Sequence, residues 1–76
     1  MNWLVYRGYV LQRMFERQIE RSVVESVMQY GTTIESYSED TPSSSRLVLG
    51  CDRDRPVHVE IEDNSSDEEI VVITVY

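Results

Sequence analysis

Residues 45–63 alternate in a way that predicts a β-hairpin with one apolar face. Successive side chains of a strand point to opposite faces of a sheet, so residues two apart share a face. The apolar face comprises Leu47, Leu49, Cys51, Val57, Val59 and Ile61. A loop at 52–54 would place position 48 opposite 58 and position 46 opposite 60. This register puts Arg46 and His58, the only histidine, together on the other, polar face.

Two amphipathic helices are predicted before this hairpin, at residues 8–18 and 21–30. Apolar residues recur at helical spacing in each, and Gly31 follows the second as a helix stop. The apolar positions are Val10, Leu11, Met14 and Phe15 in the first helix, and Val23, Val24, Val27 and Met28 in the second.

Two further strands are predicted at 32–39 and 68–76. Both faces of the last strand are apolar, which indicates a strand that is central, covered on both sides or pressed against a partner. We therefore expect one α+β domain over residues 1–76. Its two N-terminal helices pack on one face of a four-stranded antiparallel sheet, in the order ααββββ. Residues 1–6 are expected to cap the core or join an interface.

Size and charge restrict the function. A chain of 76 residues builds a small core, and its single cysteine excludes an internal disulfide, so a second copy or a partner protein would add stability. Fourteen acids face seven bases, all of them arginine, which disfavours non-specific nucleic-acid binding. We expect no metal, no cofactor, no signal peptide, no membrane span and a cytoplasmic location.

Several short motifs follow one another along the chain in a characteristic order and spacing. They are Arg13-Met14, Glu16-Arg17-Gln18-Ile19, Tyr30-Gly31, Ile34-Glu35-Ser36-Tyr37, Pro42, Ser45-Arg46-Leu47-Val48-Leu49-Gly50, Arg55-Pro56-Val57-His58-Val59 and Ile73-Thr74-Val75-Tyr76. Together they resemble the bacterial family called domain of unknown function 4258, which is grouped near the RelE-like and BrnT-like toxins of toxin-antitoxin pairs. The resemblance implies a RelE-like fold, and it implies less about activity because one fold serves many functions.

The chain departs from that family at two places. Members usually begin the first helix with threonine, any residue and histidine, whereas this chain has Arg7, Gly8 and Tyr9. Their last strand often continues with a proline and an acid, whereas this sequence ends at Tyr76. Tyr9 can donate a hydrogen bond or a proton, but it cannot act as a base at neutral pH.

If the resemblance extends to chemistry, it implies metal-independent RNA cleavage by a base, an acid and phosphate-binding cations. His58 would act as base or acid, and Arg46 would hold the phosphate. Tyr76 would position the RNA or protonate the leaving oxygen. The expected binding residues are Arg13, Arg17 and Tyr9. In a purely structural interpretation, His58, Glu60 and Arg46 form a polar cluster that stabilises the sheet face.

Two hypotheses stay open. The first is a toxin-like or toxin-derived protein, a ribonuclease acting on messenger RNA or the ribosome and held in check by an antitoxin. The second is a non-catalytic interaction module, a homodimer that uses the last strand and exposed aromatic residues. Those aromatic residues are Trp3, Tyr6, Tyr9 and Tyr37.

Overall fold

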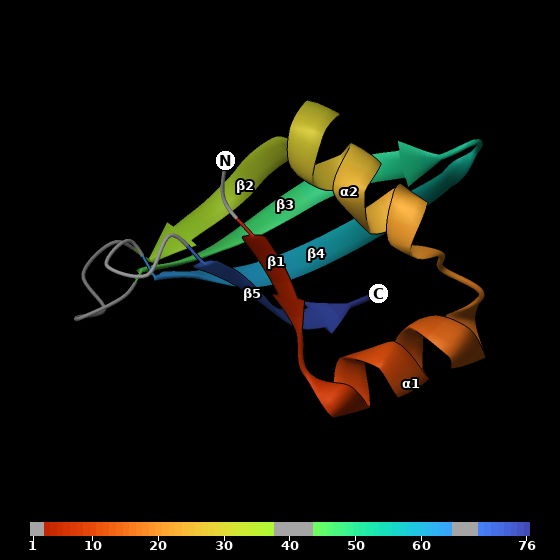
Figure 1. Ribbon diagram of the computed structural model, residues 1–76. Coiled ribbons are helices and arrows are strands. Elements are labelled where there is room, and N and C mark those ends of the chain that lie inside the picture. Colours follow the sequence, from red (N-terminus) through yellow and green to blue (C-terminus); the bar gives the residue numbers. More distant parts are fainter. Residues whose placement is uncertain (1–2, 38–43, 65–68) are drawn as a thin grey trace.

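The computed structural model describes residues 3–37, 44–64 and 69–76. Its elements follow the order β1 (Trp3–Tyr6), α1 (Gly8–Arg17), α2 (Arg21–Tyr30), β2 (Thr32–Tyr37), β3 (Ser44–Asp52), β4 (Arg55–Asn64) and β5 (Glu69–Val75) (Figure 1). Both helices and the four predicted strands are present close to their predicted bounds. Positions 38–39 and 68, which the prediction included in strands, lie outside the described residues.

The sheet has five strands in the order β1-β5-β4-β3-β2, so the prediction of a four-stranded antiparallel sheet is wrong. The additional strand, β1, pairs in parallel with β5, from Trp3 opposite Glu69 to Tyr6 opposite Val72. The other neighbours are antiparallel and sequential, as predicted, and the class remains α+β. Four apolar residues are too few to show a strand period, and their partner strand lies at the other end of the sequence.

β5, whose residues are apolar on both faces, is an interior strand of the sheet. It has β1 on one side and β4 on the other, so both of its hydrogen-bonding edges are occupied. Val72 and Val75 are fully buried in the core. Of the three environments that the sequence allowed for the last strand, the structure contains the central one.

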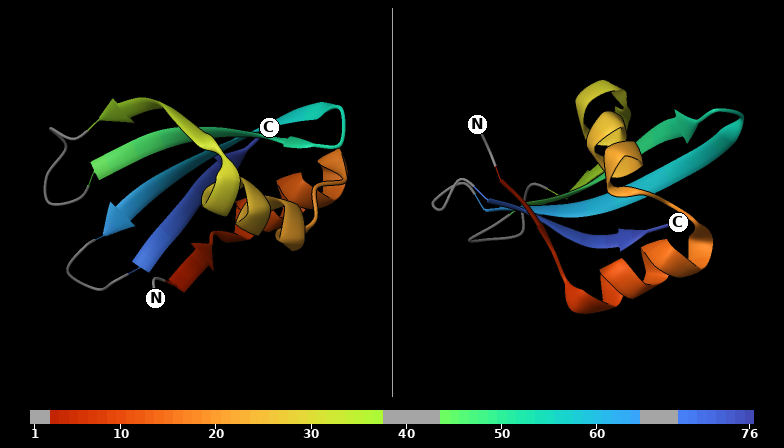
Figure 2. Two further views of the ribbon diagram at one scale, coloured as in Figure 1. Left: turned by 90° about the horizontal axis from the view of Figure 1, so that it is seen from above. Right: turned by 45° about the vertical axis from the view of Figure 1, so that its right-hand side comes forward.

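Both helices share one hydrophobic core with the same face of the sheet. Val10 and Met14 come from α1, and Val24 and Val27 from α2. The strands contribute Val48, Val57, Val59, Ile61, Ile70, Val72 and Val75. In Figure 2, α2 lies across the long strands and α1 lies beside the end of β5. In the described part of the chain, neither helix has the length and apolar content needed to cross a membrane.

The β3–β4 hairpin has a register one residue away from the predicted one. Arg53 adopts a left-handed backbone conformation, with φ of 60°, which allows a turn of only two residues between Asp52 and Arg55. Leu49 therefore lies opposite His58, and Arg46 lies opposite Ile61. No glycine marked this turn in the sequence, so the longer loop was the natural prediction.

The changed register redistributes the side chains of the hairpin. The predicted apolar face is split, because Val57, Val59 and Ile61 are fully buried under the helices while the alternate residues of both strands face away from them. We call the side away from the helices the open face. Its hairpin members are Ser45, Leu47, Leu49, Cys51, His58, Glu60 and Glu62.

Gly50 lets α2 approach the sheet. A Cβ atom at this position would lie 2.8 Å from Cγ2 of Val27. Gly50→Ala should lower the free energy of unfolding by about 1–3 kcal/mol, as overpacking of a core does, measured by urea denaturation.

Gly8→Ala is the matched control, because a Cβ at Gly8 would meet nothing within 4 Å. It should leave stability unchanged or raise it by up to about 1 kcal/mol, since alanine favours helices. Equal losses in both variants would contradict the packing explanation.

Candidate functional site

His58 and Tyr76 form a stacked pair at one end of the open face. Their ring centroids are 4.7 Å apart, and the ring planes differ by 5°. The backbone N–H of His58 donates to the carbonyl of Tyr76 at 2.6 Å, and the N–H of Tyr76 donates to the carbonyl of His58 at 2.9 Å. His58 is half-buried and Tyr76 is exposed, so this pair can be reached from solvent.

Acidic side chains surround the rest of the open face. Glu35, Leu47, Glu60 and Thr74 form one row across four strands. The next row contains Tyr37, Ser45, Glu62 and Val71. Arg7 reaches Glu62 at 4.0 Å, and the Tyr37 hydroxyl donates to the Glu35 carboxylate. The open face therefore combines carboxylates with aromatic rings around the buried Leu47.

Electrostatics link these residues across strands. The hydrogen bond to the Glu35 carboxylate is the main cause that raises the pKa of Tyr37, and the charge of Glu35 adds to it. Glu60 and Tyr76 raise the same pKa through their charges, although they belong to β4 and to the residue after β5. Tyr37, Glu60 and Tyr76 all lie on the open face.

Removing the Glu35 charge should lower the pKa of Tyr37. In Glu35→Gln the carboxylate no longer stabilises the protonated phenol, so Tyr37 should ionise at lower pH than in the parent protein. NMR titration of the Tyr37 ring measures this, and Glu16→Gln on α1 is the matched control. An unchanged Tyr37 titration in Glu35→Gln would contradict the assignment.

The structure does not bring Arg46 to His58. Arg46 lies on the helix side of β3, opposite Ile61, and its Nη1 donates to Oγ1 of Thr33 at 3.5 Å. His58 lies on the open face, opposite Leu49. The sheet separates the two side chains, because the hairpin register differs from the predicted one.

The expected binding residues of α1 form a separate group. Tyr9, Arg13 and Arg17 are spaced four apart, so they follow one side of the helix, and all three are exposed. Within the described residues, neither arginine takes part in an ion pair. α1 packs on the helix side of the sheet, whereas the stacked pair of His58 and Tyr76 lies on the open face.

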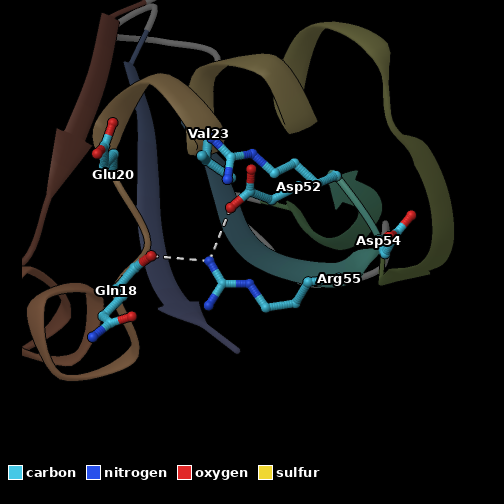
Figure 3. Close-up of a pocket in the computed structure, with 7 residues that line it drawn as sticks. Gln18, Glu20, Val23, Asp52, Asp54 and Arg55 are labelled. Atoms are coloured by element: carbon cyan, nitrogen blue, oxygen red, sulfur yellow. Dashed lines mark hydrogen bonds and ion pairs between the residues drawn. The ribbon is translucent and has the colours of Figure 1, made fainter.

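An open hollow of about 790 Å³ lies at the hairpin tip. It is lined by Gln18, Glu20, Val23, Asp52, Arg53, Asp54 and Arg55. The guanidinium of Arg55 donates to the carbonyls of Arg17 at 2.8 Å and Gln18 at 2.9 Å, and to the Asp52 carboxylate at 3.0 Å. Figure 3 shows the Arg55 guanidinium between the Gln18 carbonyl and Asp52.

These contacts make Arg55 a clamp between the hairpin tip and the end of α1. The two carbonyls lie at the C-terminal end of the helix, where backbone acceptors lack helical partners and the dipole favours a cation. No role of Arg55 was evident from the sequence alone. The sequence feature that could have indicated this contact is the spacing of Asp52 and Arg55. This spacing brings the two side chains together only if the turn has two residues.

Arg55→Lys should lower the free energy of unfolding by about 1 kcal/mol, because an ammonium cannot reproduce the forked hydrogen bonds of a half-exposed guanidinium. Arg53→Lys is the control, because the Arg53 side chain makes no hydrogen bond or ion pair within the described residues. Urea denaturation of both variants measures the difference. A loss as large in Arg53→Lys would argue against the clamp.

Comparison with known proteins gives one match. A family model described as Domain of unknown function (DUF4258) covers residues 9–76. No curated protein and no solved structure matches the chain. Among the described residues, no three histidine, cysteine or acidic side chains come together as a metal-binding group.

Proposed function

The chain belongs to the DUF4258 family, and we propose that it is an interaction module whose open face binds a basic segment of a partner protein. One observation carries the proposal. Two carboxylates, Glu35 and Glu60, lie in one row on a sheet face that points away from the helices, and the Tyr37 hydroxyl donates to Glu35 on the same face.

This chemistry suits arginine and lysine side chains. Carboxylates accept charge-assisted hydrogen bonds from guanidinium groups, and aromatic rings attract cations through their faces. Leu49 is partly exposed beside His58 and adds apolar contact area. The net charge of −7 would also accelerate association with a basic partner.

A basic protein fits this surface better than a second copy of the chain. Two copies would bring their acidic open faces together, and like charges across an interface oppose association. Charge therefore favours a basic partner over a second copy.

A toxin-like ribonuclease is the second candidate. The exposed stacked pair of His58 and Tyr76 favours it, because aromatic side chains stack on RNA bases and histidine transfers protons near neutral pH. Arg46 on the other side of the sheet and Glu60 beside the pair weigh against phosphate binding there. The RelE-like relationship, the antitoxin and the ribosome remain part of this second proposal.

The test uses a synthetic nonapeptide of alternating arginine and valine, titrated into the isotope-labelled chain and followed by NMR. Peptide-induced shifts should fall on Tyr37, Glu60 and Tyr76. The double variant Glu35→Gln with Glu60→Gln should weaken binding about fivefold to tenfold, through the loss of two exposed ion pairs.

Glu16→Gln with Glu25→Gln is the matched control, because it changes the net charge equally at exposed helix positions. Equal weakening by both double variants would reduce the effect to net charge and refute a specific site. A single-stranded RNA probe serves as the alternative ligand. If RNA binds at His58 and Tyr76 more tightly than the peptide and is cleaved, the ribonuclease replaces the interaction module.

A further inference from the structure

β2 forms an exposed edge of the sheet. The strand order places it at the end of the described sheet, and all six of its residues are exposed. Its sequence, Thr-Thr-Ile-Glu-Ser-Tyr, is rich in β-branched and aromatic residues. It has neither the proline nor the lysine with which proteins commonly block an edge, although it carries one charge, Glu35, and one bulge. The other edge, β1, has four residues and leads directly into α1.

The geometry points to β2 as the place where the partner segment adds to the sheet as a further strand, and this inference rests on the proposed function. An edge strand presents backbone N–H and C=O groups that an extended peptide can pair with. Side chains along such a peptide point alternately to the two faces of the sheet, so every second side chain would lie on the open face. Those side chains would lie beside Glu35 and Tyr37 and would be basic.

A hollow of about 250 Å³ adjoins the start of β2. It is lined by Ser26, Val27, Tyr30, Gly31, Thr32, Leu49, Gly50 and Cys51. β2 begins at Thr32, opposite Leu49, so β3 extends beyond it through Gly50 and Cys51. Strand addition obtains affinity from the backbone and specificity from such hollows. An apolar side chain of the added segment would enter here, beside the exposed ring of Tyr30.

The bulge in β2 is compatible with an added strand. The pairing with β3 shifts between Thr33 and Glu35, which leaves Ile34 outside the regular register. Ile34 is 47 % exposed and offers apolar contact to the new neighbour. The expected ligand therefore alternates basic residues toward the open face with apolar residues toward the helix side. This pattern and the backbone pairing specify a protein segment.

The experiment measures how tightly three forms of the arginine-valine nonapeptide bind to the full chain. One form is unmodified, one carries backbone N-methyl groups on the arginines, and one carries them on the valines. N–H groups of alternate residues point to opposite edges of a strand, so only one methylated form blocks pairing with β2. That form should bind at least about tenfold more weakly, and the other should bind as the unmodified peptide does.

Hydrogen exchange supplies the second measurement. The unmodified peptide should slow the exchange of those β2 amide protons that point away from β3. If all three peptides bind equally at the open face and β2 exchange does not change, strand addition is wrong and the proposed function stands. If no form binds, the proposed function and this inference both fail.

Discussion

The two-residue turn at Arg53 and Asp54 decides which side chains meet on each face of the sheet. Residues alternate along a strand, so a turn one residue longer would exchange the two faces of one strand relative to the other. With the short turn, Val48 meets Val59 in the core and Leu49 meets His58 on the open face. The position of every candidate residue in the hairpin depends on this local choice.

The same turn also determines where the arginines act. Arg55 becomes the partner of Asp52 and of the α1 carbonyls, and Arg46 is directed to the helix side beside Thr33. Arg7 pairs with Glu62 at the open face. The remaining described side chains around Tyr37 and Glu60 keep that face acidic. The chain thus uses some of its few cations for structural contacts, which favours a basic partner over RNA.

The sequence predicted the helices and the strands β3, β4 and β5 because each has a repeated apolar pattern over enough residues to be recognised, and it predicted β2 from its β-branched and aromatic residues. It did not predict β1, whose four residues show no period, or the turn, whose left-handed residue is an arginine instead of a glycine. The direct pairing of Tyr76 with His58 was not predicted, because the expected partner of position 58 was position 72. The separation of Arg46 was not predicted either, because a face assignment changes completely with a shift of one residue.

The parallel contact of β1 with β5 also has a kinetic consequence. Residues 3–6 have no sheet neighbour until residues 69–75 have been synthesised. The α1 helix, which follows β1 directly, likewise packs beside β5. Contacts between such distant segments slow folding, because a long loop must close before they form. The edge strand β1 and its neighbour β5 are therefore the first and the last strands of the described sheet in chain order.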